Sequence, residues 1–493
     1  MKPTRLLLLA SVALLLNGCN VGPDYHPPTT QNVPKQWSEP LAGGETAQPD
    51  PAAAWWKNFH DPELDSLINR AIAANLDLQM AEDRVRQARA QYGIANSDFL
   101  PTLDGSASFS QQQQSQNQPV LGSFSVPSSA FNNNVYQAGF DASWEIDVFG
   151  GTRRNVEAVR ADVAAAEFSR RDVLVIVLGE VARDYVQTRI DQRRLAIAEA
   201  NIQAQQDGLN LTQERYDKGL TSALDVEQAA TLLATTQAEV PTLQSSIKVS
   251  IHRLGVLLAQ PPGALQQELS ATAPIPAAPP QVPVGLPSDL LRRRPDVQQA
   301  ERELAAQTAR IGVATADLFP KFYLTGTAGF ESVSASDWFA GASKFWSIGP
   351  TLQWKLFEGD KIRSNIKVQT ALQQQALANY EKTVLISLSD VDDSLTEYAN
   401  EQMRRQSLER AVASSQDSLN LANERYKDGI ASFLDVLEAE RSLLLTQDQL
   451  ALSDGLVTVD VISLYKALGG GWETVDLKTP PAPTAPAPTV AQM

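Results

Sequence analysis

Two periods of apolar and polar residues run along this chain, and the longest stretches follow the helical one. Residues 152–218 contain no proline, and residues 360–428 contain neither proline nor glycine. An uninterrupted helix of that length extends on the order of 100 Å, at about 1.5 Å per residue. Each stretch ends at a glycine, Gly219 or Gly429, the residue that best accepts the left-handed backbone after a helix. The pattern therefore predicts one very long helix in each half of the chain.

A second helix is expected after each glycine, at about 221–259 and 431–468. Its apolar residues recur every seven positions, as Val226, Leu233, Val240, Ile247 and Leu254 in the first copy and as Val436, Leu443, Leu450 and Val457 in the second. A seven-residue apolar repeat indicates left-handed coiled-coil packing. We expect two helical hairpins, at about 152–259 and 360–468, each folded back at its glycine turn.

The chain repeats itself at a long, fixed offset. The stretch ERYDKGLTSALDV begins at Glu214, and ERYKDGIASFLDV begins at Glu424, 210 residues later. Matched residues on both sides of these stretches keep the same offset. So long a period is typical of a duplicated domain, and it divides the chain into a first repeat, 64–286, and a second repeat, 287–472.

A third helical piece opens each repeat, at about 64–98 and 288–318. This piece and the second helix of the hairpin together come close to the long helix in length. We therefore expect the two shorter helices to stack end to end beside the long one.

Four segments alternate with the period of a strand. They lie at about 102–110, 135–147, 321–331 and 345–357, and the clearest reads YQAGFDASWEID. A soluble antiparallel sheet with one wet face would give the same alternation. Their length of about ten residues, the aromatic residues near the ends of the apolar face and the strongly polar opposite face favour a transmembrane β-barrel.

The loops and the strand count extend this prediction. The polar segments 111–134 and 332–344 are expected to be extracellular loops. Four strands cannot close a barrel, because closure needs about eight or more. Two copies of the chain would supply eight strands and three copies twelve, and a water-filled conduit favours three.

The first residues read as a targeting signal. A basic start, Met1–Arg5, precedes the apolar run Leu6–Leu16, which predicts a secretory signal peptide over residues 1–18. The run ends in LNGC, which resembles a bacterial lipobox, so a covalent lipid is expected on Cys19 and no other cofactor. Residues 19–63 would form a lipidated N-terminal segment and an equatorial region. The proline-rich tail, 473–493, is expected to be disordered.

Composition excludes several kinds of protein. The formal net charge of −16 argues against a nucleic-acid partner, which needs a basic face. The three histidines, His26, His60 and His252, are not clustered with thiols or carboxylates, so no metal site is expected. The sequence holds no phosphate loop, nucleophile elbow or dinucleotide fingerprint, and we expect no catalytic residue and no enzyme activity.

One stretch resembles a known family. The sequence PSDLLRRRPDVQQAERELAAQTARIGVATADLFPKFYLTG (287–326) is similar to the most characteristic part of the outer membrane factor family, the TolC-like exit ducts. CNVGPDYHPP (19–28), WW at 55–56, LDVLEAERSLL (435–445) and ALGGGW (467–472) resemble its lipoprotein branch, which serves RND efflux pumps.

The resemblance implies a mixed α and β fold in a homotrimer. A 12-stranded transmembrane β-barrel, four strands per protomer, would lie in the outer membrane of a Gram-negative bacterium and continue as a long periplasmic α-helical barrel of coiled-coil hairpins. Its partners would be outer membrane lipid, a periplasmic adaptor (membrane fusion protein) and an inner-membrane RND transporter. The function implied is a passive efflux duct for drugs or other toxic small molecules, hence a part in multidrug resistance.

The resemblance also implies a gate at the periplasmic tip. The gate residues carried over are Asp435, Glu438, Leu434, Tyr426, Asp225 and Arg441. Asp435 and Glu438 would form two stacked carboxylate rings that favour cations, and Tyr426 and Asp225 would tie the second hairpin to the first. Ala431 stands where TolC has an arginine, and Arg441 is a candidate substitute. The alternative is that both acidic residues are ordinary solvated charges of a coiled coil.

The hairpin turns would be the surfaces that the adaptor contacts. Their residues are Gly219, Leu220, Ser222, Gly429, Ile430 and Ser432. Two other functions remain open. One is an exit duct for type I protein secretion, and the other, of a different class, is a soluble periplasmic coiled-coil scaffold. The lipobox and the LLRRRPD stretch favour efflux.

Overall fold

The computed structural model describes residues 20–28, 33–39, 45–46, 53–113, 132–279 and 282–473. The predicted signal peptide, Cys19 and nearly all of the predicted tail lie outside these residues. The chain forms two compact units. The sheet unit comprises Met1–Thr29, Arg84–Ala166 and Gln299–Glu381, and the hairpin unit comprises Thr30–Asp83, Glu167–Gln298 and Lys382–Met493.

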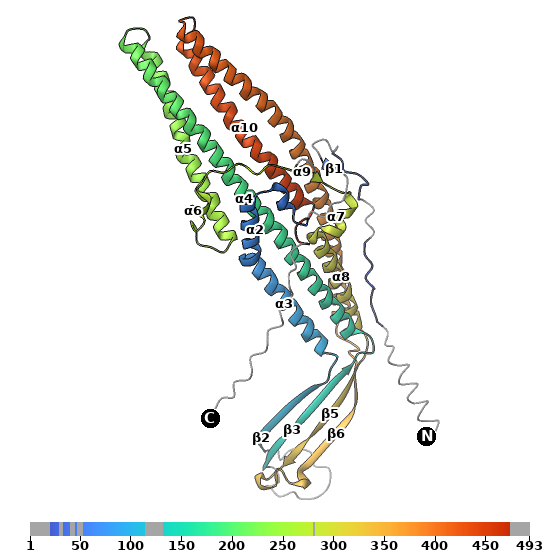
Figure 1. Cartoon of the computed structure of the whole chain (residues 1–493). Coiled ribbons are helices and arrows are strands. Elements are labelled where there is room, and N and C mark those ends of the chain that lie inside the picture. The colour runs from blue at the N-terminus through green and yellow to red at the C-terminus, as the bar shows by residue number, and fades with distance from the viewer. Residues whose placement is uncertain are drawn as a thin grey trace. The chain divides into compact units, whose positions relative to one another are not determined.

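The two long hairpins are present, and they match residue for residue. Helix α4 (Gly151–Asp217) is followed by α5 (Ala223–Leu257), and α9 (Lys361–Lys427) is followed by α10 (Phe433–Ala467) (Figure 1). Every bound of the second hairpin lies 210 residues after its counterpart. Buried residues of the predicted seven-residue repeat are Leu233, Ile247 and Leu254 on α5 and Val436, Leu443 and Val457 on α10.

The helical piece that opens each repeat is broken, which corrects the prediction of one helix at 64–98 and one at 288–318. The first repeat has α2 (Pro62–Ala74) and α3 (Leu76–Ser97), and the second has α7 (Pro287–Arg293) and α8 (Pro295–Ala316). Asn75 leaves the helical region at ψ 130°. Arg294 leaves it at ψ 119° because the proline after it disfavours a helical backbone.

Each break receives the end of a hairpin. The side-chain amide of Asn75 donates to the carbonyl of Leu257, the last residue of α5, over 2.9 Å. The guanidinium of Arg294 donates to the carbonyl of Ala467, the last residue of α10, over 3.1 Å. Leu257 and Ala467 are equivalent positions of the repeat, so both halves are joined in the same way. These contacts supply a partner for a helix-terminal carbonyl that has none within its own helix.

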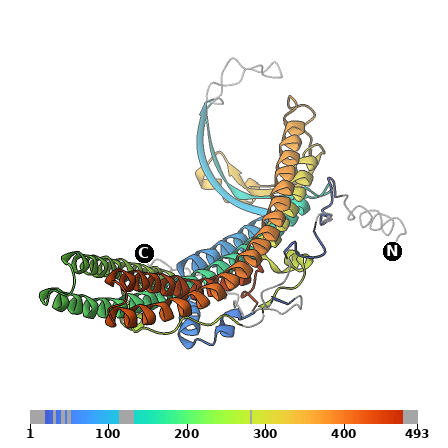
Figure 2. The same cartoon turned by 90° about the horizontal axis from the view of Figure 1, so that it is seen from above.

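The strands form one antiparallel sheet in the sheet unit, in the order β2-β3-β5-β6. Their bounds are Thr102–Gln113, Asn132–Ile146, Lys321–Ser332 and Lys344–Gln353. Figure 2 shows the sheet strongly curved. The outer edges of β2 and β6 pair with no other strand among the described residues. A curved sheet with two open edges can be completed only by strands from elsewhere.

Three strand limits differ from the predictions. Strands β2 and β3 extend into the predicted loop 111–134 as far as the pair Gln113 and Asn132, because polar side chains can continue a ladder whose apolar alternation has stopped. Strand β6 ends at Gln353, so Trp354, Leu356 and Phe357 lie beyond it. The predicted polar loop 332–344 also holds two stacked rings, Trp338 and Phe339, whose centroids are 4.8 Å apart.

One face of the sheet exposes large apolar side chains. Leu103, Phe140 and Trp346 are 70%, 62% and 76% exposed. The indoles of Trp144 and Trp354, equivalent positions of the repeat, each donate to the carbonyl of a residue before a strand, over 2.9 and 3.1 Å. So large an apolar surface has to be covered by another molecule or by lipid.

The smaller elements lie around these two frameworks. They are β1 (Glu45–Thr46), which pairs with β4 (Val282–Pro283), together with η1 (Trp55–Phe59), α6 (Gln266–Leu269), η3 (Ala335–Asp337) and η4 (Gly341–Ser343). In the hairpin unit the ring of Trp55 is fully buried and stacks on Tyr465 at 5.5 Å. None of the described helices combines the length and the apolar composition needed to cross a membrane.

Candidate functional site at the hairpin tips

Both hairpin turns are closed by the same device. In the first turn the carboxylate of Asp225 accepts from the backbone N–H and the hydroxyl of Ser222, over 3.0 and 2.9 Å. In the second, Asp435 accepts from the same two groups of Ser432, over 2.9 and 3.0 Å. The glycine before each cap has a positive φ, which allows the chain to reverse. The repeated sequence thus encodes a helix cap, and one role of Asp435 is to hold its own turn.

One residue makes the two turns unequal. Thr221 donates to Asp225 over 2.5 Å, and this hydrogen bond is the main cause that lowers the pKa of Asp225. Ala431 occupies the equivalent position of the second turn and has no hydroxyl. The hydrogen bonds that the Asp225 side chain makes with described residues all stay within its own turn. The first turn is therefore the more firmly capped of the two.

The second hairpin is packed against the first through Tyr426. This tyrosine is 7% exposed, whereas its equivalent in the first hairpin, Tyr216, is 44% exposed. The guanidinium of Arg215, on α4, lies 4.4 Å from the centre of the Tyr426 ring. The ring also contacts Phe433 at 5.4 Å. The Tyr426 hydroxyl is buried and has no hydrogen-bond partner among the described residues, so the contact between the hairpins is made by the ring.

A small apolar cluster surrounds this contact. Its buried members are Ala229 and Leu232 on α5, and Tyr426, Phe433, Val436 and Leu437 on the second hairpin. The sequence indicated this cluster, because the second copy has the larger apolar residues Phe433 and Leu437 where the first copy has Ala223 and Glu227. The sequence did not indicate the role of Arg215, because the second copy also has an arginine at the equivalent position. We call these residues, together with Arg215, the tip cluster.

The other predicted gate residues lie at the surface of the chain. Glu438 and Arg441 form an ion pair of 3.3 Å in which both side chains are more than half exposed. Leu434 is 48% exposed. The predicted adaptor contacts Leu220 and Ile430 are 64% and 68% exposed at the two turns. Arg441 is therefore engaged with Glu438 and does not replace an inter-hairpin contact within this chain.

Polar residues also join α4 to α10 behind the tip cluster. Arg194 pairs with Asp448, with its closest contact at 2.6 Å. One α4 heptad nearer the tip, the amide of Asn201 donates to Gln447 over 3.2 Å. The next two positions at this spacing are Gly208, which faces Glu440, and Arg215 of the tip cluster. We call these four levels the inter-hairpin seam, which the apolar pattern alone did not reveal.

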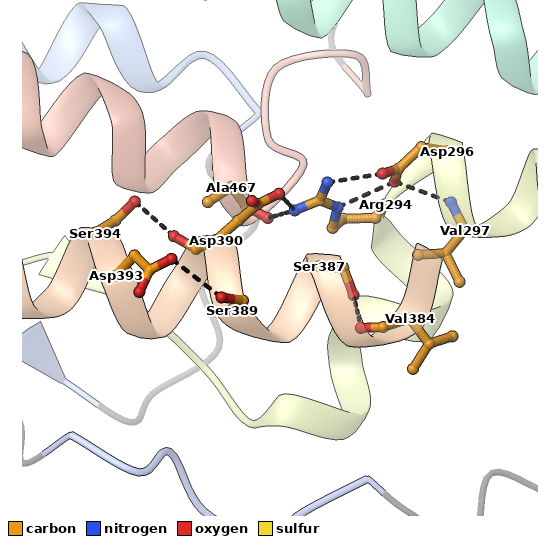
Figure 3. A network of polar contacts seen from close by, with 10 residues as sticks. All are labelled: Arg294, Asp296, Val297, Val384, Ser387, Ser389, Asp390, Asp393, Ser394 and Ala467. Atoms are coloured by element: carbon orange, nitrogen blue, oxygen red, sulfur yellow. Dashed lines mark hydrogen bonds and ion pairs between the residues drawn. The ribbon is translucent and has the colours of Figure 1, made fainter. Parts of the chain in front are cut away.

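The LLRRRPD stretch has a structural role. Arg294 holds Asp296 through two hydrogen bonds, of 3.0 and 2.7 Å, and Asp390 through one of 2.8 Å, in addition to the carbonyl of Ala467 (Figure 3). Burial, chiefly, and the nearby Asp296 raise the pKa of Asp172 at this site to about 6. The guanidinium, in a side chain that is 11% exposed, thus joins α8, α9 and the end of α10. Among the described residues, no group of three or more His, Cys, Asp or Glu side chains is arranged to hold a metal ion.

Comparison with known proteins identifies the family. The family model described as "Outer membrane efflux protein" matches residues 67–260 and 286–470, one match for each repeat. The chain belongs to this family.

Individual relatives match along nearly their whole length. Nodulation protein T of Rhizobium leguminosarum bv. trifolii is 34% identical over 466 residues, covering 94% of this chain and 97% of the relative. The toluene efflux pump outer membrane protein TtgC of Pseudomonas putida is 33% identical, covering 95% and 96%. The solved outer-membrane channel OprN superposes with a TM-score of 0.85 at 35% identity, covering 92% of this chain and all of that one.

Proposed function

We propose that this protein is the outer membrane channel of a tripartite efflux pump, a passive duct for drugs or other toxic small molecules. The observation that carries the proposal is the family match to both repeats, on a chain of which 92% superposes on an outer-membrane channel. A relative described as part of a toluene efflux pump supports an organic cargo. The exposed apolar face of the sheet provides the surface that a membrane would cover.

The assembly that we propose contains three copies of the chain. Each copy supplies four strands with open outer edges, and three sheets joined edge to edge make a closed barrel of twelve strands, wide enough to hold water. A covalent lipid on Cys19 adds a second membrane anchor. The exposed turns around Gly219 and Gly429 meet a periplasmic adaptor, which links the duct to an inner-membrane RND transporter.

The tips of the hairpins act as the gate in this proposal. Contacts of the tip cluster hold the second hairpin of each chain against the first. Asp435 and Glu438 lie three residues apart, hence on one face of α10. Three copies brought together at the tips would place their carboxylates in two rings, which favour cations over anions. The exposure of the Glu438 side chain within one chain fits a position that faces a water-filled pore.

The proposal is tested by deleting the gene in its own host. Loss of the duct is expected to raise sensitivity to several unrelated toxic compounds, and the wild-type gene is expected to restore resistance. The protein is expected in the outer membrane fraction, with heat-modifiable migration in detergent, as for a folded barrel. Recovery in the soluble periplasmic fraction, without heat modifiability, would instead support a coiled-coil scaffold.

A further inference from the structure

One level of the inter-hairpin seam differs from the other three. Those three are filled by an ion pair, an amide pair and a cation over a ring. At the remaining level Glu440 faces Gly208, and a Cβ placed on this glycine would lie 3.8 Å from Oε1 of Glu440. No hydrogen bond or ion pair reaches the Glu440 side chain from any residue that the structure describes. Glu440 is thus a carboxyl of the seam that faces the other hairpin without an ion-pair or hydrogen-bond partner among the described residues.

The surroundings of Glu440 are apolar or unpaired. It lies between Leu437 and Leu443 on one face of α10, and both leucines are buried. On α4, one turn from Gly208, Gln205 is only 4% exposed, and neither polar atom of its amide has a partner in the part of the chain that the structure describes. The equivalent of Glu440 in the first hairpin is Ala230. An ionised carboxylate is costly in such a place, because no charge or hydrogen bond replaces the water it has lost.

No other charge compensates Glu440. The charged groups closest to its level on the four helices are exposed or engaged elsewhere: Asp207, Glu214 and Arg215 on α4, Glu227 and Glu239 on α5, Asp417, Glu424 and Arg425 on α9, and Glu438 and Arg441 on α10. Burial alone raises the pKa of Glu440, to about 7. The carboxyl therefore changes its charge near neutral pH while the hairpins are packed.

We propose that Glu440 is a proton-controlled contact between the hairpins: protonated, it lets α4 and α10 stay packed, and ionised, it favours their separation. The sign follows from the raised pKa. The packed state is favoured in full below the ordinary glutamate pKa of 4.5, and this advantage is lost as the pH rises through about 7. The proposal deepens the proposed gate, on which it rests, by giving the hairpin tips a pH response.

The test measures the seam itself. Gln203 and Leu445 are exposed and lie on α4 and α10 near the level of the Asn201–Gln447 contact. Spin labels on cysteines at these two positions report the separation of the helices by double electron–electron resonance. The full-length protein is used in detergent or lipid, diluted with unlabelled chain so that only pairs within one chain contribute.

The labelled protein is expected to show a pH-dependent mixture of a short and a longer distance. The ratio of separated to packed seams should rise by about tenfold from pH 5 to pH 8.5, since each unit of pKa shift is worth a factor of ten and partial exposure reduces the full effect. Glu440→Gln should keep the short distance at both pH values. A pH response that survives Glu440→Gln, or no response in the parent protein, would overturn the proposal.

A matched control separates Glu440 from another titrating carboxyl of α10. Asp460 also has a pKa of about 7, raised by burial and by Glu397 and Glu401. Asp460→Asn should leave the seam response intact, because its neighbours lie on α9. If Asp460→Asn lost the pH response while Glu440→Gln kept it, the switch would belong to Asp460 and the proposal for Glu440 would be overturned. The distances are read without any ion flow, so a protein that fails to conduct would refute the proposed duct without deciding this proposal.

Discussion

The contact between Tyr426 and Arg215 gives the sharpest prediction about the gate. The resemblance to TolC-like ducts implied that Tyr426 ties the hairpins together, and a hydroxyl hydrogen bond would be the obvious means. In this structure the hydroxyl is buried and meets no hydrogen-bond partner in the described ranges, and the ring makes the contacts. Tyr426→Phe should therefore keep the gate closed, whereas Tyr426→Ala should open it.

The magnitudes follow from the geometry. Truncation of a buried aromatic ring to alanine typically costs about 3–5 kcal/mol, enough to leave the tip mostly open. Removal of a buried hydroxyl that has no partner costs nothing and can stabilise the packed state by about 1 kcal/mol. Arg215→Ala removes a half-buried cation over a ring, worth about 1 kcal/mol. The open population should then rise about fivefold, since about 1.4 kcal/mol is a factor of ten.

The assay is the open probability of the purified protein in planar bilayers. Arg425→Ala is the matched control, because Arg425 is the equivalent of Arg215 in the second hairpin and is exposed; it should leave the open probability unchanged. If Tyr426→Phe opened the channel as much as Tyr426→Ala does, the hydroxyl would be the tie and the argument from the ring would be refuted.

Three further predictions concern other parts of the hairpin unit. Arg294→Gln should lower stability by about 2 kcal/mol or more, measured as a fall in Tm, because it leaves two carboxylates and a helix-end carbonyl without their cation; an unchanged Tm would contradict this. Asp435→Ala combined with Glu438→Ala should raise conductance and reduce cation selectivity in bilayers, and unchanged values would remove the case for carboxylate rings. Thr221→Ala should raise the pKa of Asp225, so that on acidification the stability contributed by this cap is lost at a higher pH than in the parent protein. Carboxyl titration by NMR, or Tm measured over a pH series, would detect the raised pKa. A titration of Asp225 that is unchanged in Thr221→Ala would rule the effect out.

The long helices and the strands of the sheet could be predicted from the sequence because their patterns of apolar residues are periodic. The helical stretches without proline and the offset of 210 residues located both hairpins, whose observed ends keep that offset. The alternating segments located the four strands of the antiparallel sheet. The breaks at Asn75 and Arg294 were missed, because a helical apolar pattern continues across a single residue whose backbone turns.

Much of the site could not be read from the sequence. The roles of Arg215 and Glu440 depend on the residues that they face on other helices, and only the packed structure shows which residues of α4 meet which residues of the second hairpin. The seven-residue spacing of Arg194, Asn201 and Gly208 was visible in the sequence, but polar residues on a coiled coil are usually solvated. Asp435 was read as a gate residue, and the structure adds its local role as a helix cap.

The most direct test of the central claim is single-channel recording of the purified full-length protein in planar bilayers. If the protein is a passive duct gated at its hairpin tips, it should insert as discrete channels that are mostly closed, and Tyr426→Ala should convert them to a long-lived conducting state without any energy source. A folded protein that never produces discrete channels, as wild type or as Tyr426→Ala, would contradict the account.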